Sequence, residues 1–361
     1  MLFFIDAFGW RFFERFQDTP FLARIGKQGH IEKLTSQFPS TTAAHVTTIH
    51  TGLPVGESGI HEWYYYEPLV DRIVAPLLFS FSGTKARDTL NATGLDPARL
   101  YPQGIFYPEL KKVGVESFNF GMRDYTPSTY SKIMMRGSKL RPFKTLPEAL
   151  VNIRLLLEKQ TTPTYIHLYF DRIDALGHEY GPSAPQTEAE IEAFLRLMND
   201  NLDRTFRTTR RILFMMTADH GMCEVDPHTT VYLNTNPDFH GFERFIKRNQ
   251  DGVLLIPAGS ARDMFLYINE EMLDEARFFL AERLNGKADV VKTNDLIQDG
   301  YFGPTVSPRF LDRVGNLVIL PYRHESVWWY EKDKFEQRYY GHHGGLTPQE
   351  MEIALYSLAF G

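Results

Sequence analysis

Acidic, histidine and threonine side chains recur in short segments of this chain that end or follow predicted strands. Four such segments are Phe3–Gly9, Phe38–Gly52, Asp171–Pro182 and Thr217–Met222, and a fifth, Gly341–Leu346, lies near the C-terminus. Open α/β sheets bind ligands beyond the carboxyl ends of their strands, so segments that are far apart in the sequence can meet there. The side chains of these segments are therefore the candidates for chemistry.

Six of these side chains could together hold metal ions: Asp6, Asp174, Asp219, His178, His220 and His343. Cys223 is the only cysteine, which excludes a disulfide within the chain and a zinc site built on thiolates. Six nitrogen and oxygen ligands can supply two sites with three protein ligands each, and such sites keep the open position that catalytic zinc requires. Two metals roughly 4 Å apart can stabilise the attacking and the leaving oxygen of an in-line phosphoryl displacement.

Each segment taken alone also has a purely structural explanation. Asp6 could cap a helix, and Asp174 and His178, four residues apart, could be an exposed pair on one helix face. The His342-His343 pair could lie in a solvated loop, and a Ser-Thr-Thr run often starts a helix. The occurrence of all five segments in one chain favours the metal site over these separate explanations.

The elements that must position these residues alternate between apolar runs and helical patterns. The expected strands are Leu2–Ile5, Glu116–Phe120, Tyr165–Phe170, Ile212–Met216 and Leu317–Leu320. The expected helices are Pro147–Glu158, Thr187–Phe206 and Met272–Leu284. Several runs are continuously apolar, as in parallel strands covered on both faces. The alternation predicts an α/β fold with a doubly wound sheet and helices on both faces.

Two regions interrupt this alternation. Residues 62–139 are rich in Tyr, Pro and Gly and are expected to form an elaborated connection within the core. Residues 238–312 have their own strand and helix and are expected to form a smaller inserted cap. The predicted catalytic core therefore comprises residues 1–237 and 313–361.

Charge and composition limit the partners of the protein. The 361 residues have a formal net charge of -6, with Lys and Arg scattered along the chain. This disfavours long DNA or RNA as a substrate and leaves small phosphate esters open. Met1–Asp6 lacks the basic start of a signal peptide, and no run of 18 apolar residues occurs, so we expect a cytoplasmic protein without membrane association. The sequence leaves the oligomeric state open.

The five segments together resemble the type I phosphodiesterase/nucleotide pyrophosphatase family of the alkaline phosphatase superfamily. Phe38–Gly52 is similar to its nucleophile segment, Asp174–Pro182 to its Asp-x-x-x-His metal motif with a following Gly-Pro, and Ala218–Met222 to its second metal pair. His343-Gly344-Gly345 resembles the last ligand segment. The resemblance implies an alkaline-phosphatase-like core and hydrolysis of phosphodiester or pyrophosphate bonds in small, nucleotide-like molecules.

The resemblance also assigns roles to individual residues. Asp6, Asp219 and His220 would bind one metal ion beside the hydroxyl of Thr42, the nucleophile, which would form a phospho-threonine intermediate. The other three ligands, Asp174, His178 and His343, would bind the second ion. Thr42 is preferred to Thr41 and His343 to His342 because their positions match the family spacing, and Asp171 is expected to be a hydrogen-bonding neighbour. The ions are expected to be Zn²⁺, with Mn²⁺ as the alternative.

Two positions depart from the family pattern. Ala43 stands where an aromatic residue usually follows the nucleophile and stacks on a nucleobase, and His45 stands where an Asn usually holds the phosphoryl oxygens. His45 could donate to a phosphate oxygen or cap its helix. Trp63 and Tyr64, in an aromatic run, could supply a replacement stacking wall or only pack in the core.

Three other functions fit parts of the same pattern. A phosphomonoesterase or phosphonate hydrolase would share the metal ligands. A metal-dependent phosphoglycerate mutase would need a Ser nucleophile and a larger inserted domain than residues 238–312 provide. An inactive binding module would keep the fold, but six intact ligands argue against it.

Overall fold

The computed structural model describes residues 1–206 and 211–360. Its centre is a seven-stranded sheet in which the strands follow the order β2, β17, β9, β1, β8, β6 and β7. Their bounds are β1 Leu2–Ile5, β2 His30–Thr35, β6 Glu116–Met122, β7 Lys139–Phe143, β8 Thr164–Phe170, β9 Ile212–Thr217 and β17 Glu352–Phe360. Strands β9, β1, β8, β6 and β7 are parallel, and β17 is antiparallel to both of its neighbours.

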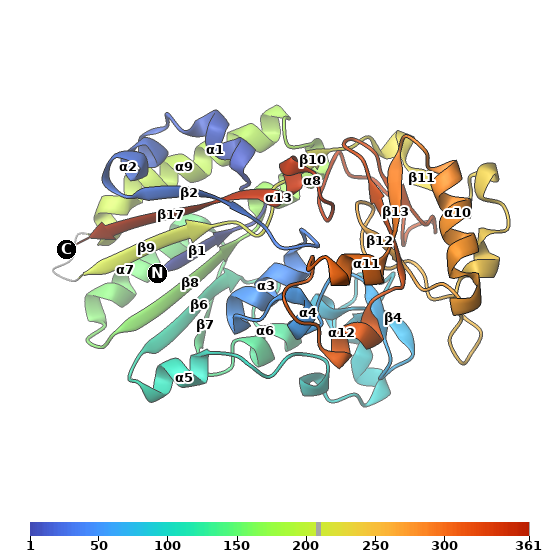
Figure 1. Ribbon diagram of the computed structural model, residues 1–361. Coiled ribbons are helices and arrows are strands. Elements are labelled where there is room, and N and C mark those ends of the chain that lie inside the picture. Colours follow the sequence, from blue (N-terminus) through green and yellow to red (C-terminus); the bar gives the residue numbers. More distant parts are fainter. Residues whose placement is uncertain (207–210, 361) are drawn as a thin grey trace.

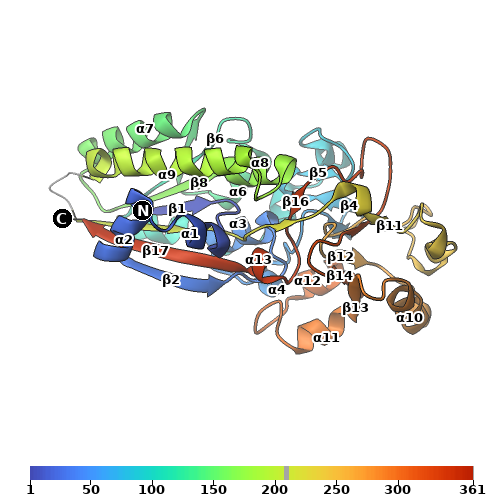
Figure 2. The same cartoon turned by 90° about the horizontal axis from the view of Figure 1, so that it is seen from above.

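Helices cover both faces of this sheet, which confirms the predicted α/β fold (Figures 1 and 2). One face is covered by α1 Trp10–Phe16, α2 Pro20–Gln28, α7 Leu146–Lys159, α8 Arg172–Tyr180 and α9 Pro185–Phe206. The other is covered by α3 Thr42–Thr51, α5 Tyr107–Lys112 and α6 Thr129–Met134. Strand β1 shows why both faces need cover. Phe3 and Ile5 pack into the core on the first face and Phe4 into the core on the second, because side chains alternate along a strand.

A second, three-stranded antiparallel sheet lies at the end of the molecule opposite both termini (Figure 1). It contains β12 Met264–Leu266, β14 Leu317–Pro321 and β13 Ala288–Lys292, in that order, and packs with α10 Leu273–Arg283. The expectation that Leu317–Leu320 forms a strand of the main sheet is therefore wrong. The run is the central strand of the smaller sheet and is buried on both faces there, and an apolar run looks the same in either setting.

The region between α3 and β6 folds into a third small sheet of β3 Tyr65–Glu67, β4 Arg72–Ala75 and β5 Ser80–Phe81. The other short elements are α4 Val55–Ser58, β10 Cys223–Glu224, β11 Val231–Tyr232, α11 Thr293–Gln298, α12 Pro308–Arg313, β15 Val327–Trp328, β16 Gly341–His342 and α13 Pro348–Met351, with 3-10 turns at Pro76–Leu78, Thr89–Thr93, Pro97–Arg99, Pro227–Thr229, Pro237–Phe239, Phe242–Phe245 and Glu270–Met272. Among the described residues, none of the helices has the length and apolar character needed to span a bilayer.

Candidate active site

Asp6 and Asp219 lie at the carboxyl ends of two adjacent parallel strands. Strand β1 ends at Ile5 and β9 at Thr217, so the residues that follow meet at one edge of the sheet. The Nε2 atom of His220 lies 3.4 Å from Asp6 Oδ1 and 3.5 Å from Asp219 Oδ2. The backbone N–H groups of Ala7 and His220 donate to Asp219 Oδ1 at 3.1 and 3.0 Å, which fixes this carboxylate with its other oxygen facing His220.

The other three predicted ligands gather beside this group. Asp174 and His178 lie on the same face of α8, and the His178 Nε2 atom is 3.4 Å from Asp174 Oδ1. The Nε2 atom of His343, which follows β16, is 3.7 Å from Asp174 Oδ1 and 3.2 Å from His178 Nε2. The rings of His220 and His343 stack with centroids 3.6 Å apart, so the two groups adjoin. All six side chains converge, as the sequence predicted.

The three histidines are all held in the orientation of metal ligands. Each Nδ1 atom lies at hydrogen-bond distance from a backbone carbonyl: His178 from Gly341 at 2.8 Å, His220 from Gly221 at 2.8 Å and His343 from Ser40 at 2.9 Å. A carbonyl can only accept, so each Nδ1 carries the proton and each Nε2 presents a lone pair to the shared centre. This is the arrangement that metal-binding histidines adopt, with the second ring nitrogen donating to a carbonyl.

Three buried carboxylate oxygens at the same centre have no hydrogen-bond partner among the described residues: Asp6 Oδ1, Asp174 Oδ1 and Asp219 Oδ2. Burial, together with repulsion from Asp219, raises the pKa of Asp6 and of Asp174 well above the usual aspartate value. Burial lowers the pKa of His343 well below its usual value. Facing lone pairs and unpaired carboxylate oxygens are what divalent cations would satisfy, so the residues present fit a metal site.

Ligand atoms from three residues lie within 4.8 Å of one another in each of two groups, Asp6–Asp219–His220 and Asp174–His220–His343. The first is the set that the resemblance implied for one ion. The second contains His220 in place of His178, although His178 contacts both Asp174 and His343. The geometry therefore brings together two overlapping groups of potential ligands that share His220.

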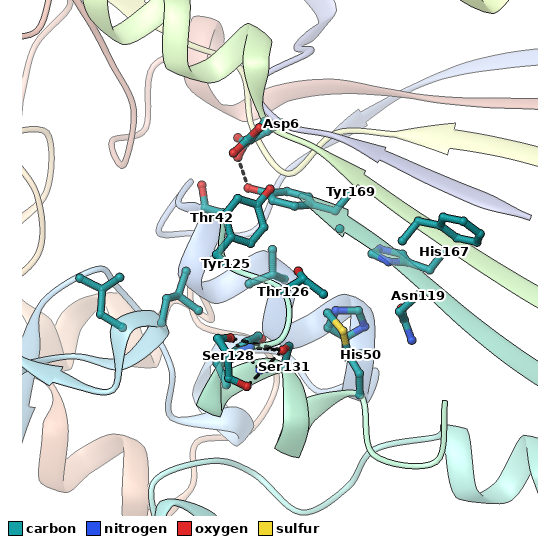
Figure 3. Close-up of a pocket in the computed structure, with 18 of the residues that line it drawn as sticks. Asp6, Thr42, His50, Asn119, Tyr125, Thr126, Ser128, Ser131, His167 and Tyr169 are labelled. Atoms are coloured by element: carbon teal, nitrogen blue, oxygen red, sulfur yellow. Dashed lines mark hydrogen bonds between the residues drawn. The ribbon is translucent and has the colours of Figure 1, made fainter. Parts of the chain in front are cut away.

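Thr42 is the first residue of α3, and its Oγ1 atom lies 3.2 Å from His220 Nε2. The N-cap residue of this helix, Thr41, makes no side-chain capping bond, so N–H groups of the first turn are available for an anion. Thr42, unlike Thr41, lines a cavity together with Asp6 and Asp174. Figure 3 shows Thr42 near Asp6. The structure thus sets the Thr42 hydroxyl beside the carboxylates and the helix N-terminus.

Tyr169 is a contact of this site that the sequence did not reveal. Its hydroxyl donates to Asp6 Oδ2, so one oxygen of Asp6 is occupied and the other faces His220 (Figure 3). Tyr169 lies on β8, beside Phe4 of β1, and only this pairing brings it to Asp6. Asp171 lines the cavity one helical turn before Asp174, and its buried Oδ1 atom has no hydrogen-bond partner among the described residues, so the expected hydrogen-bonding role stays a prediction.

The three residues predicted to contact the substrate, His45, Trp63 and Tyr64, do not all reach the cavity. His45 lies on α3 with Nδ1 2.7 Å from the Thr41 carbonyl and Nε2 2.7 Å from Ser36 Oγ, so both ring nitrogens have protein partners. Trp63 lines the cavity beside Thr42. Tyr64 does not line it and packs edge-on against Phe335, with ring centroids 5.9 Å apart. Only Trp63 is thus brought to the cavity.

Comparison with known proteins identifies a family for the chain. The sequence model of the type I phosphodiesterase/nucleotide pyrophosphatase family matches residues 1–346. Human ectonucleotide pyrophosphatase/phosphodiesterase family member 7 is 29% identical over 93 residues, which are 25% of this chain and 19% of the human protein. The chain thus matches only about a fifth of that relative's length.

Solved structures share the fold at low sequence identity. Murine ectonucleotide pyrophosphatase/phosphodiesterase 5 superposes with a TM-score of 0.71 at 18% identity, over 99% of this chain and 87% of the murine chain. An inactive threonine-to-alanine variant of the murine protein in complex with AMP gives 0.71 at 17% identity, over the same shares. Human ectonucleotide pyrophosphatase/phosphodiesterase 5 gives 0.70 at 17% identity, over 100% and 87% of the two chains.

The family match spans residues 1–346, nearly the whole chain, and the shared fold agrees with it. The chain therefore belongs to the type I phosphodiesterase/nucleotide pyrophosphatase family of hydrolases, within the alkaline phosphatase superfamily.

Proposed function

We propose that this protein hydrolyses phosphodiester or pyrophosphate bonds of small, nucleotide-like molecules, with Thr42 as the nucleophile and two divalent metal ions as cofactors. One observation carries the proposal: the Thr42 hydroxyl, 3.2 Å from His220 Nε2, stands where two groups of carboxylate and imidazole ligands adjoin. Asp6, Asp219 and His220 would hold one ion, and Asp174, His178 and His343 the other. Zn²⁺ suits these ligands best, and Mn²⁺ is the alternative.

The residues of the chain supply orientation and charge for two successive displacements. Bound divalent cations would lower the pKa of the attacking hydroxyl or water and offset charge on the leaving oxygen. The Oγ1 atom of Thr42 forms a bond to phosphorus while the bond to the leaving oxygen breaks, and water then cleaves the phospho-threonine to release the phosphoryl product. N–H groups in the first turn of α3 donate to the phosphoryl oxygens.

The nucleophile is tested by Thr42→Ala and Thr42→Ser. We expect Thr42→Ala to abolish turnover of bis(4-nitrophenyl) phosphate with bound metal unchanged, because the ligands remain, and Thr42→Ser to keep measurable activity because it retains a hydroxyl. The murine variant that is inactive with a threonine replaced by alanine supports this design. Undiminished turnover by Thr42→Ala would refute the nucleophile.

Metal dependence is tested on the wild-type protein. Chelation should abolish turnover, and added Zn²⁺ or Mn²⁺ should restore it. An enzyme that stays active after complete metal removal would contradict the proposed cofactors. A protein that binds metal but hydrolyses neither monoesters nor diesters would be the inactive binding module.

The cavity beside Thr42 favours a diester over a monoester, since it offers a place for an organic group on the phosphate. We therefore expect higher kcat/KM on 4-nitrophenyl phosphodiesters than on 4-nitrophenyl phosphate. The opposite order, or preferential cleavage of a carbon–phosphorus bond, would identify a phosphomonoesterase or a phosphonate hydrolase with the same ligands.

A further inference from the structure

We propose that two buried histidines, His50 and His167, recognise a neutral hydrogen-bonding group at the far end of the substrate. The proposal rests on the proposed function and names the substrate class: phosphodiesters whose organic group is elongated, largely apolar, and ends in a planar amide with an N–H donor beside a C=O acceptor. A cyclic amide of a heterocycle has this chemistry.

The cavity beside Thr42 extends along α3 to both histidines. Thr42, Val46 and His50 all line it, and successive members lie four residues apart, so they share one face of the helix. Figure 3 labels Thr42 and His50 among the lining residues. Eight residues of helix span about 12 Å. The cavity has a volume of about 260 Å³, and its walls include apolar side chains such as Leu77 and Phe120. A substrate group of matching length could enter it while the phosphate stays at Thr42.

A chain of directed hydrogen bonds fixes the protonation of His50. It begins at the Met135 carbonyl, which accepts from Ser138 Oγ at 2.7 Å, so Ser138 must in turn accept from Asn119 Nδ2, at 2.6 Å. The Asn119 amide therefore points Oδ1 to the Tyr107 hydroxyl, which donates to it at 3.0 Å. With its single proton used, Tyr107 must accept from His50 Nδ1 at 2.7 Å.

His50 therefore carries its proton on Nδ1 and presents a bare lone pair on Nε2. Burial lowers the pKa of His50 well below its usual value, so the ring is neutral at pH 7. The Nε2 atom is buried and has no hydrogen-bond partner among the described residues. A buried acceptor without a donor costs about 1–3 kcal/mol, and a ligand donor would remove that cost.

His167 completes the recognition site. Its ring meets that of His50 edge-on, with centroids 4.9 Å apart, and it lines the same cavity. Neither of its nitrogens has a hydrogen-bond partner in the described part of the chain, and burial lowers its pKa to about 3. Neutral His167 offers one N–H donor and one lone pair. The pair thus complements a group with both a donor and an acceptor, and it gives no charge to hold an ionic one.

A flexible side chain bears on access to these nitrogens. Met135 also lines the cavity, and its unbranched side chain can change rotamer to admit a group.

His61 provides the contrast. It is equally buried, with both nitrogens lacking partners among the described residues, but it is packed between Tyr65, Phe265 and Phe310 and does not line the cavity. A place on the cavity wall, not burial alone, distinguishes His50 and His167.

The test compares two esters that differ in one donor: thymidine 5′-(4-nitrophenyl) phosphate and its N3-methyl analogue. We expect wild-type kcat/KM to be about tenfold higher or more for the N–H ester, since methylation leaves a buried acceptor unpaired. His50→Phe should abolish this preference, and His50→Gln, which keeps an acceptor, should restore part of it. His61→Phe is the matched control and should keep the full preference.

Equal wild-type rates on the two esters would overturn the proposal, and so would a preference that survives His50→Phe. If His50→Phe does not fold, the wild-type comparison and His167→Phe decide the matter. Phenyl 4-nitrophenyl phosphate distinguishes failure of the recognition site from failure of the proposed function, because it is a diester that lacks the distal amide. Hydrolysis of this diester together with equal rates on the two thymidine esters would refute only the recognition site. Absence of hydrolysis of every ester would refute the proposed function.

Discussion

At the residue scale, the candidate metal site is defined by which atoms of each ligand already make hydrogen bonds within the protein. His178, His220 and His343 are tied through Nδ1 to backbone carbonyls, and Asp219 is tied through Oδ1 to two N–H groups. Tyr169 occupies the second oxygen of Asp6. The remaining atoms of these ligands point at one another, so the backbone fixes the positions that cations would take.

The neighbouring histidines His342 and His343 offer a matched test of this arrangement. His343→Ala should lose about one equivalent of tightly bound metal, because its Nε2 atom faces Asp174 and His178. His342→Ala should retain both equivalents, since the Nδ1 of His342 lies 2.9 Å from the His343 carbonyl and His342 belongs to neither ligand group. Metal analysis of the purified variants measures the difference, and equal loss in both would contradict the assignment.

The site residues that the sequence predicted belong to spaced sequence motifs, whereas those it missed are brought to the site only by the fold. Asp174 and His178 stand in a spaced motif, so their convergence with His343 was predictable. Tyr169 stands in no motif, and His50 lies within the nucleophile segment Phe38–Gly52 at a position to which the motif gives no role. One depends on the register of two strands and the other on a cavity between a helix and the sheet, and neither can be read before the fold is known.

At the element scale, the loop that carries His343 is clamped by a buried ion pair. Arg262, just before β12, donates to both oxygens of Glu350 at 3.0 and 2.8 Å, and both side chains are fully buried. Glu350 in turn accepts from Gly345 N–H and the Thr347 hydroxyl. The smaller sheet is thereby joined to the segment that follows the last predicted ligand.

Arg262→Met should lower the free energy of unfolding by about 3–5 kcal/mol, because it leaves the Glu350 carboxylate buried without its partner. The double variant Arg262→Met/Glu350→Gln should recover part of this loss, since the uncompensated charge is removed. Denaturant unfolding of the three proteins measures both effects. A single variant as stable as the wild type would show that the clamp does not contribute.

Two strands differ from the sequence prediction for opposite physical reasons. Strand β2 has the sequence His-Ile-Glu-Lys-Leu-Thr and lies at the edge of the sheet, so it is mostly exposed and shows no apolar run. Leu317–Leu320 has the opposite property, since its apolar run predicts a central strand but not the sheet to which it belongs. The predicted bounds of the inserted cap, residues 238–312, stay a prediction, and the smaller sheet draws on residues from both sides of position 312.

At the scale of the whole molecule, buried neutral histidines should govern the response to acid. Burial lowers the pKa of His61 and of His167 from 6.5 to about 3, and that of His50 well below 6.5. Below pH 6.5 the unfolded chain binds protons at these rings while the folded chain does not. Stability contributed by each ring is therefore present at neutral pH and is lost progressively as the pH falls below about 6.5, and for His61 and His167 this loss continues toward pH 3.

His61→Phe isolates this effect, because His61 lies outside the cavity and the metal centre. Between pH 4 and 6, the free energy of unfolding should fall less steeply in the variant, by about 1.4 kcal/mol per pH unit. Denaturant titrations in the presence of chelator, at several pH values, give the two slopes. Parallel slopes would show that His61 is protonated equally in both states.

Strand β17, near the end of the chain, inserts between β2 and β9, two strands that are made much earlier. During synthesis, the edges of β2 and β9 must wait unpaired until Glu352–Phe360 has left the ribosome. Such edges are templates for intermolecular pairing, so the nascent protein should depend on chaperones and aggregate when translation stalls late. Refolding from denaturant should also be slow, because the decisive pairing joins segments more than 300 residues apart.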